Sequence, residues 1–339
     1  MEMKALVIEK PGIARVQAVP AAQVGERDLR IKVMASGICG TDVHIFRGEY
    51  LGGYPVIPGH EFSGVVEETG ALVTRFRAGD HVAVEPNISC DNCRACLSNR
   101  QNFCENWNAV GVTLPGGMAE YAVVPEKAAF SIGELPFLAG AFVEPLSCVL
   151  HGVERAGIKL GDRVLILGAG PIGILLSKAI QLRGASVITQ VDLNPSRLEL
   201  AAKSGAAVCA SLDELERDSF DVVVDASGAI SLMEKAPDFA RKGGTVLWFG
   251  VPKRDAKLEL PAFTIFEKGL FLLSSYTSVR NSLQAVELLA KGKIDVAPLV
   301  SHQLPLEDFA RGVEIIEKGV EGVLKVVVLP SGTVSPSML

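Results

Sequence analysis

The sequence has little of what directs a protein to membranes or nucleic acids. No run of about 18 apolar residues occurs, and the segment Met1–Leu6 lacks the basic flank and apolar core of a signal peptide. The 33 Lys and Arg residues are outnumbered by 39 Asp and Glu residues, so the net charge of -6 gives no attraction to DNA, RNA or anionic lipid. We therefore expect a cytoplasmic protein with no nucleic-acid or membrane partner.

The chain also lacks internal repeats and the composition of a disordered protein. Apolar residues make up 48% of the sequence and charged residues 21%, which is a normal globular mixture. A chain of 339 residues exceeds what one hydrophobic core usually organises. Length and composition together predict two folded domains.

The cysteines do not follow the pattern of a disulfide framework. Their number, seven, is odd, and four of them lie between Cys90 and Cys104, which is typical of metal chelation in a reducing compartment. The spacing of Cys90, Cys93, Cys96 and Cys104 lets four thiolates surround one tetrahedral zinc ion. Such a closed site has no open coordination position, so we expect a structural zinc. Iron–sulfur ligation and unliganded thiols are the alternatives.

The sequence pattern changes along the chain. Residues 1–150 contain short β segments, such as 29–33 and 62–66, separated by Gly, Pro and Asp turns, which predicts a mostly antiparallel β domain. Strands and helices then alternate, and the strands are continuously apolar, as in a parallel sheet buried on both faces. We predict a doubly wound α/β domain of Rossmann type over 151–284, with 285–339 returning to the first domain.

The expected elements of the second domain have clear boundaries. One helix begins at Pro171, and the next has Asn194 as its N-cap and Gly205 as its C-terminal stop. The last strand, 270–273, would be an exposed edge in a monomer, and pairing two such edges across a two-fold axis would cover it. The other expected strands are 163–167, 186–191, 207–209, 221–225 and 244–249.

A glycine pattern follows the first of these strands and opens the helix after it. A dinucleotide-binding G-x-G-x-x-G motif requires this context. Gly168 allows the tight turn, Gly170 lets a pyrophosphate approach the backbone, and Gly173 permits close packing of the helix, whose N-terminus faces the phosphates. The motif consists of Gly168, Ala169, Gly170, Pro171, Ile172 and Gly173.

An acidic residue, Asp192, ends the second strand and is expected to bind the adenosine ribose hydroxyls. A carboxylate there repels a 2′-phosphate and favours NAD over NADP. Arg197 leaves the choice open, because it could stack on the adenine or assist a phosphate. S-adenosylmethionine is another ligand that such a fold accepts. Three residues that follow later strands are expected to line the cofactor: Ser227, Gly250 and Ser274.

Two short motifs outside the cysteine cluster contain Cys39 and the pair His60 and Glu61. A thiolate, an imidazole and a carboxylate suit zinc and leave one position open, as Lewis-acid catalysis requires. Each residue alone is uninformative, since a lone cysteine is more often part of the core and a His-Glu pair is common on surfaces.

These motifs together resemble one known family. The segments Gly37–His44 and Gly59–Gly64, the four cysteines and the glycine pattern have the order and spacing of the zinc-containing medium-chain dehydrogenases, and the resemblance covers nearly the whole chain. Within this family, Gly59–Gly64 and Phe142–Leu146 are similar to the polyol branch, typified by sorbitol, arabitol and galactitol-phosphate dehydrogenases. The resemblance implies a GroES-like catalytic domain with a structural zinc lobe at 90–104, a Rossmann domain that binds NAD, and two zinc ions per chain. It also implies a homodimer or homotetramer.

The resemblance also assigns roles around the catalytic metal. Cys39, His60 and Glu61 would ligate the catalytic zinc. Glu144 would be either a fourth ligand or hydrogen-bonded to the metal-bound water, and both arrangements stay open. Asp42 would orient His60 and fix its tautomer.

A proton relay is implied as well. Thr41 would accept the proton of the substrate hydroxyl and pass it through the cofactor ribose to His44, which exchanges it with solvent. Water held by Glu144 is the alternative route.

The implied reaction moves a hydride from a secondary hydroxyl of a polyol to NAD and yields a ketose. An amino alcohol such as threonine, a cyclitol and a phosphorylated polyol are alternative substrates, and a non-catalytic NAD-binding protein is an alternative of another class. Some sorbitol dehydrogenases carry an arginine where this chain has Ser275. Polyol binding would then rely on other groups, such as Tyr50, Arg47 or Glu120.

Overall fold

The protein divides into two compact units. The first comprises Met1–Ser147 and Val279–Leu339, and the second is Cys148–Ser278. Both borders lie a few residues before the predicted ones. The structure, a computed structural model, describes residues 1–49, 53–320 and 322–332.

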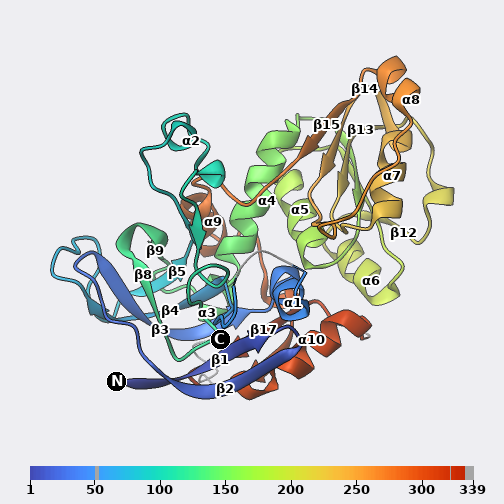
Figure 1. The fold of residues 1–339 in the computed structure, drawn as a ribbon. Coiled ribbons are helices and arrows are strands. Elements are labelled where there is room, and N and C mark those ends of the chain that lie inside the picture. The colour runs from blue at the N-terminus through green and yellow to red at the C-terminus, as the bar shows by residue number, and fades with distance from the viewer. Residues whose placement is uncertain (50–52, 321, 333–339) are drawn as a thin grey trace. The chain divides into compact units, whose positions relative to one another are not determined.

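A seven-stranded sheet organises the first unit (Figure 1). The strand order is β16-β17-β3-β4-β5-β9, with β8 paired to β3, and β16 with β17 is its parallel pair. Strand β17, from the end of the chain, pairs antiparallel with β3, so the last segment completes the sheet begun near the N-terminus. The strands are β3 (Asp28–Gly37), β4 (Glu61–Thr69), β5 (His81–Val84), β8 (Tyr121–Pro125), β9 (Ala129–Ser131), β16 (Val300–Pro305) and β17 (Lys325–Leu329).

Smaller elements complete this unit. A two-stranded hairpin is formed by β1 (Glu2–Lys10) and β2 (Ile13–Pro20), and a second short pair by β6 (Asn87–Ile88) and β7 (Asn108–Ala109). The helices are α1 (Gly40–Arg47), α2 (Arg94–Leu97), α3 (Phe137–Gly140), α9 (Ser282–Ala290) and α10 (Phe309–Lys318), with single 3₁₀ turns at Gln101–Phe103, Glu126–Ala128, Ala297–Leu299 and Leu306–Asp308.

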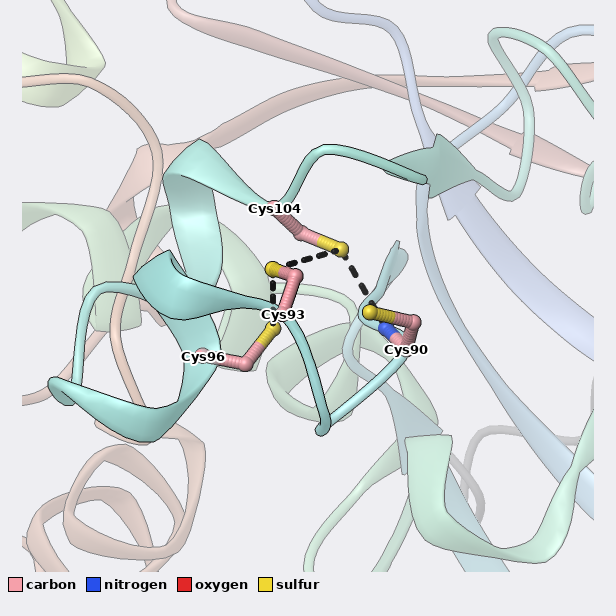
Figure 2. Close-up of side chains that lie close together, drawn as sticks. All are labelled: Cys90, Cys93, Cys96 and Cys104. Carbon is pink, nitrogen blue, oxygen red and sulfur yellow. Dashed lines mark hydrogen bonds between the residues drawn. The ribbon is translucent and has the colours of Figure 1, made fainter.

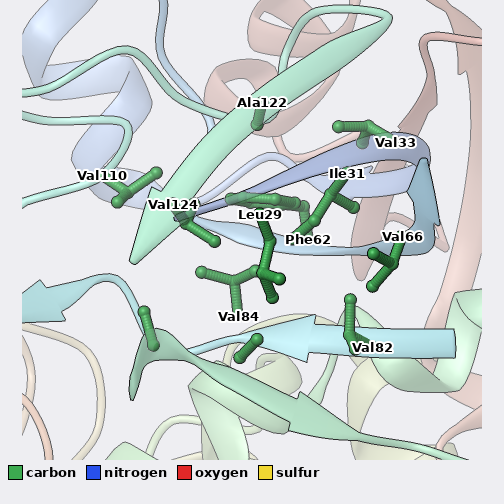
Figure 3. Packing of buried hydrophobic residues seen from close by; sticks show 12 residues of the cluster. Leu29, Ile31, Val33, Phe62, Val66, Val82, Val84, Val110, Ala122 and Val124 are labelled. Carbon is green, nitrogen blue, oxygen red and sulfur yellow. The ribbon is translucent and has the colours of Figure 1, made fainter. Parts of the chain in front are cut away.

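Alternating side chains of the central strands build the main core of this unit. Leu29 and Ile31 point inward from β3 and meet Phe62 and Val82 from the neighbouring strands (Figure 3). All four are almost fully buried. Burying one side chain of this size stabilises the fold by about 1.5–3 kcal/mol, so this period-two pattern holds the strands in register.

A six-stranded parallel sheet forms the second unit. Its order is β12-β11-β10-β13-β14-β15. From β10 the chain adds strands first on one side of β10 and then, starting with β13, on its other side, as in a doubly wound fold. Helices α5 and α7 lie on opposite faces of the sheet (Figure 1). The strands are β10 (Arg163–Leu167), β11 (Val187–Val191), β12 (Ala207–Cys209), β13 (Phe220–Asp225), β14 (Ala240–Trp248) and β15 (Phe271–Ser274). The helices are α5 (Pro171–Leu182), α6 (Pro195–Lys203), α7 (Ile230–Phe239) and α8 (Ala262–Lys268), with a 3₁₀ turn at Leu212–Glu214.

The local signals for these elements are confirmed. The Asn194 side chain accepts hydrogen bonds from the backbone of Ser196 and Arg197 and caps α6, and Gly205 follows the helix with a φ of 91°. The predicted strand at 244–249 is longer than expected, because β14 begins at Ala240 and continues through an irregularity in its pairing with β13.

The division of the chain between the two units falls within helix α4 (Val143–Ala156), after Ser147. By length and composition alone, the helical stretch Phe137–Ala156 could cross a membrane. However, 78% of its apolar window is buried inside the protein, and the buried Glu144 lies within it. The apolar side chains of this helix therefore pack in the core.

Candidate active site and metal centres

The first unit brings Cys39, His60 and Glu61 together. Cys39 is the N-cap of α1, His60 directly precedes β4, and Glu61 begins that strand. The strand pairing joins the two motifs, because Gly37 at the end of β3 lies opposite Glu61. The metal-binding atoms of the three residues all lie within 4.8 Å of one another. This spacing and this donor set fit a single zinc ion.

Asp42 links the backbones of the two motifs. Its fully buried carboxylate accepts hydrogen bonds from the N–H of Cys39 (2.8 Å) and from the N–H of Gly59 (3.2 Å). The distance from its Oδ1 to Nδ1 of His60 is 3.6 Å, which is too long for a hydrogen bond. Asp42 therefore holds Cys39 and the turn before His60 in place through their backbones, and it acts on the imidazole by charge.

The electrostatics of this cluster favour a cation. Burial alone would lower the pKa of His60, but the charges of Asp42 and Cys39 raise it well above its ordinary value. An upward shift against the effect of burial indicates an excess of negative charge around the imidazole. A bound divalent metal would balance that excess in place of the proton.

A buried lysine that the sequence analysis missed also belongs to this cluster. Lys325, on β17, forms an ion pair with Glu61, and both side chains are almost fully buried. Burial lowers the pKa of Lys325, whereas Glu61, Cys39 and Glu144 raise it, and the net shift is upward. The available signal was a single lysine in the otherwise apolar strand Lys325–Leu329.

Glu144 lies in the first turn of α4 and is 8% exposed. Its carboxylate is not in the group of ligand atoms that lie within 4.8 Å of one another, although its charge acts on Lys325. Its position is compatible with a role beside a metal-bound water, and its direct ligation of the metal stays a prediction. Thr41 and His44 both lie on α1, three positions apart and therefore on one side of the helix.

The four cysteines of the predicted zinc lobe, which spans residues 90–104, point toward one another (Figure 2). The sulfur of Cys93 lies 3.4 Å from that of Cys96 and 4.0 Å from that of Cys104. Zinc–sulfur bonds of about 2.3 Å in a tetrahedron place sulfurs roughly 3.8 Å apart, so these separations fit one zinc ion. The backbone N–H of Asn92 lowers the pKa of Cys90 to about 6, whereas burial raises the pKa of Cys96 to about 12. A metal ion would replace the remaining protons.

One exposed cation ties the lobe to the rest of the first unit. Lys127 donates to the carbonyl of Ser89 and to the carboxylate of Asp91 at 2.7 Å. The hydrogen bond from Lys127 lowers the pKa of Asp91. Apart from its cysteines, the lobe is thus held to the first unit in part by the surface ion pair of Lys127 and Asp91.

The glycine loop of the second unit has the geometry that its sequence predicts. Gly168 follows β10 with a φ of 116°, and Gly170 is the N-cap of α5. A Cβ atom at Gly173 would lie 2.1 Å from the carbonyl oxygen of Gly168, so only glycine allows the helix to pack this closely. Pro171 and Ile172 form the first turn of the helix, whose free N–H groups suit a phosphate.

Asp192 follows β11 and braces this loop. Its Oδ2 accepts a hydrogen bond from the N–H of Ala169 at 2.8 Å, and its Oδ1 accepts one from the N–H of Asn194 at 2.9 Å. Arg197 lies 3.9 Å from the same carboxylate. The sequence predicted a ribose ligand here, and the structure adds that the carboxylate positions the loop itself.

The remaining cofactor-side residues lie at the same edge of the sheet, after successive strands. Ser227 follows β13 and donates from its backbone and hydroxyl to Asp225, whose pKa is raised by burial. A Cβ atom at Gly250 would lie 2.1 Å from the backbone nitrogen of Gly228, so the two turns touch. Ser274 is the last residue of β15 and is exposed. Ligands of doubly wound sheets bind at this carboxyl edge.

Two of the three residues suggested as alternative substrate contacts bind other residues of the protein. Arg47 forms a two-pronged ion pair with Glu317. The carboxylate of Glu120 accepts a hydrogen bond from the N–H of Lys4 at 2.7 Å. Tyr50 lies outside the described residues.

Comparison with known families agrees with this geometry. Residues 25–134 match the alcohol dehydrogenase GroES-like domain, and residues 171–291 match the zinc-binding dehydrogenase family. The chain belongs to the zinc-binding alcohol dehydrogenases. The predicted fold class and family are thereby confirmed, as are zinc and a nicotinamide nucleotide as the cofactors of this family.

Relatives of this zinc-binding dehydrogenase act on small hydroxyl compounds. D-altritol 5-dehydrogenase of Agrobacterium fabrum is 38% identical over 314 residues, which cover 90% of this chain and 94% of the relative. L-threonine 3-dehydrogenase of Bacillus velezensis is 32% identical over 97% of this chain and 99% of the relative. A solved structure from Sinorhizobium meliloti 1021, described as a zinc-binding dehydrogenase bound to NADP, is 35% identical with a TM-score of 0.92 and covers 97% of this chain and 100% of its own. The chain is therefore an oxidoreductase that acts on CH–OH groups.

Proposed function

We propose that this dehydrogenase oxidises a secondary hydroxyl of a polyol to a ketone, with NAD as the hydride acceptor and a ketose as the product. The observation that carries the proposal is the cluster of Cys39, His60 and Glu61 within 4.8 Å, with the buried Glu144 at the start of α4. The similarity to D-altritol 5-dehydrogenase supports a polyol as the substrate class.

Different residues of the chain would bind the metal and transfer the proton. Cys39, His60 and Glu61 would hold a zinc ion, which would supply the Lewis acidity that lowers the pKa of the substrate hydroxyl. Thr41 takes up the hydroxyl proton, and His44 on the same helix releases it to solvent. The proton and the hydride thus leave the substrate by separate routes.

We infer that NAD is preferred over NADP. The carboxylate of Asp192 is held by two backbone N–H groups and repels a 2′-phosphate. The guanidinium of Arg197 lies 3.9 Å from that carboxylate, whose negative charge attracts it. The Sinorhizobium meliloti relative was solved with NADP, so the ratio of kcat/KM for the two cofactors is the deciding measurement. A ratio in favour of NADP would refute the inference.

A substrate panel tests the proposed reaction. Altritol, arabitol, sorbitol, inositol, galactitol 1-phosphate and threonine are each incubated with the zinc-loaded enzyme and NAD, and the absorbance of reduced cofactor is followed. We expect turnover of at least one free polyol. The absence of polyol turnover would overturn the proposal.

Threonine is the second candidate substrate. The relative from Bacillus velezensis supports it, because the similarity spans nearly the whole of both chains. Turnover of threonine without turnover of any polyol would establish this candidate in place of the first.

We further propose a cytoplasmic homo-oligomer that pairs through the edge of β15. Strand β15 exposes Phe271 (62%), and the helix that precedes it in the chain, α8, exposes Phe263 (74%) and Phe266 (81%). Burying them against a second copy would remove both the apolar surface and the free strand edge. Sedimentation of the wild type and of F271E tests this, since a monomeric wild type would contradict it.

A further inference from the structure

The end of helix α1 places a carboxylate beside the histidine of the proposed relay. Gly48 caps the helix in the left-handed conformation, with a φ of 80°. The chain therefore turns back, and the N–H of Glu49 donates to the carbonyl of His44 at 2.8 Å. The backbone of Glu49 is thus fixed against that of His44.

The two side chains also meet. Oε2 of Glu49 lies 2.9 Å from Nδ1 of His44, and the imidazole is 24% exposed. An ionised carboxylate can only accept a hydrogen bond, so Nδ1 must carry the hydrogen. In a neutral imidazole this leaves the electron pair on Nε2. The contact therefore selects which ring nitrogen can take up a proton.

We propose that Glu49 is a positioning residue that holds neutral His44 in its Nδ1–H tautomer, so that Nε2 is the atom that accepts the proton released during alcohol oxidation. This inference rests on the proposed function, in which His44 ends the relay. The substrate O–H bond breaks and its proton passes by way of Thr41 to Nε2, while the C–H bond on the same carbon breaks and its hydrogen leaves with both bonding electrons as the hydride that NAD accepts. Nδ1–H stays bonded to Glu49 throughout, and the proton on Nε2 then leaves to water.

The surrounding charges leave this pair intact. Arg47 lies on the same helix, and its pKa is raised first by the hydrogen bond that it donates to Glu317 and to a lesser extent by the charge of Glu49. Because Glu317 binds the guanidinium of Arg47 through both oxygens, the arginine does not draw Glu49 away from His44.

Nitrogen NMR of the zinc-loaded protein labelled at histidine reads the tautomer directly. The chain has five histidines, and H44Q identifies the signal of His44. We expect the Nδ1–H form in the wild type, the Nε2–H form in E49A, and retention of Nδ1–H in E49Q, whose amide oxygen can still accept the bond. An Nε2–H form in the wild type, or an unchanged tautomer in E49A, would overturn the proposal.

Kinetics on a substrate found by the panel provide the second measurement. We expect E49A to lower kcat about 10-fold, as is typical when a group that orients a functional side chain is lost, with partial rescue in E49Q and little change in the KM for NAD. E287A, an exposed glutamate of α9, serves as the matched control.

A double variant separates positioning from a general structural effect. In the H44Q background, E49A should cost nothing further, and an equal additional loss of kcat would contradict the proposal. If no polyol is turned over, the proposed function fails, but the tautomer measurement still decides the role of Glu49.

Discussion

The two candidate metal centres of the first unit are built in opposite ways. The lobe takes all four ligands from one segment, Cys90–Cys104, and its ligands are thiols alone. The candidate catalytic cluster joins the start of α1 to the start of β4, and β17 contributes the buried Lys325. The lobe thus depends on its metal to hold a loop together, whereas the strand pairing and Asp42 hold the cluster in place independently of a metal.

The largest expected effect comes from the cluster. C39A removes a predicted ligand, so we expect kcat to fall by about 10³-fold or more, because Lewis-acid activation supplies several kcal/mol of transition-state stabilisation. Metal analysis should show one zinc per chain instead of two, and the melting temperature should change little. Retention of two zinc ions with full activity would exclude Cys39 as a ligand.

Loss of a lobe ligand should lower the stability of the lobe more than it lowers catalytic activity. In C93A the loop loses its zinc, and with it metal-binding free energy on the order of several kcal/mol. Limited proteolysis should then cut within 90–104, and the melting temperature should fall. C209A, which changes a buried cysteine of the second unit, is the control and should keep both zinc ions. Uncut C93A with two zinc ions would contradict the assignment.

Breaking the buried ion pair of Lys325 and Glu61 should have an effect of intermediate size, on both stability and zinc affinity. K325M leaves the Glu61 carboxylate without its cation, and breaking a buried pair typically costs about 3–5 kcal/mol, so the metal-free protein should melt earlier. The loss of the positive charge that repels a metal ion should let the freed carboxylate bind zinc about 10-fold more tightly in a chelator competition. K318M, on the surface of α10, is the control. Weaker zinc binding in K325M would show that Lys325 supports the metal site.

The smallest expected effect concerns the surface contact of the lobe. K127A removes the ion pair with Asp91, whose side chains are about half exposed, so the free energy of unfolding should fall by less than about 1 kcal/mol. The difference from wild type should shrink further in concentrated salt, which screens exposed charges. A salt-independent loss of several kcal/mol would mean that Lys127 has a structural role beyond the pair.

The elements that could be predicted are those whose signal is local. Asn194 caps α6 through neighbours two and three residues away, and the glycine loop follows its strand directly. The pairing of Lys325 with Glu61 had no such signal, because it depends on β17 lying beside β3 in the same sheet as β4. The bond of Asp192 to Ala169 was missed for the same reason, since it joins the ends of two strands that only the sheet brings together.

Spacing and periodicity in the sequence were enough to predict the fold class, the four-cysteine site and the residue types of the catalytic cluster, because they specify local geometry and ligand chemistry. Tertiary structure alone decided what surrounds those residues. It brought the N–H of Gly59 to Asp42 and placed Lys325 on Glu61. These contacts join distant parts of the chain and arise from strand order, which is settled only when the chain packs.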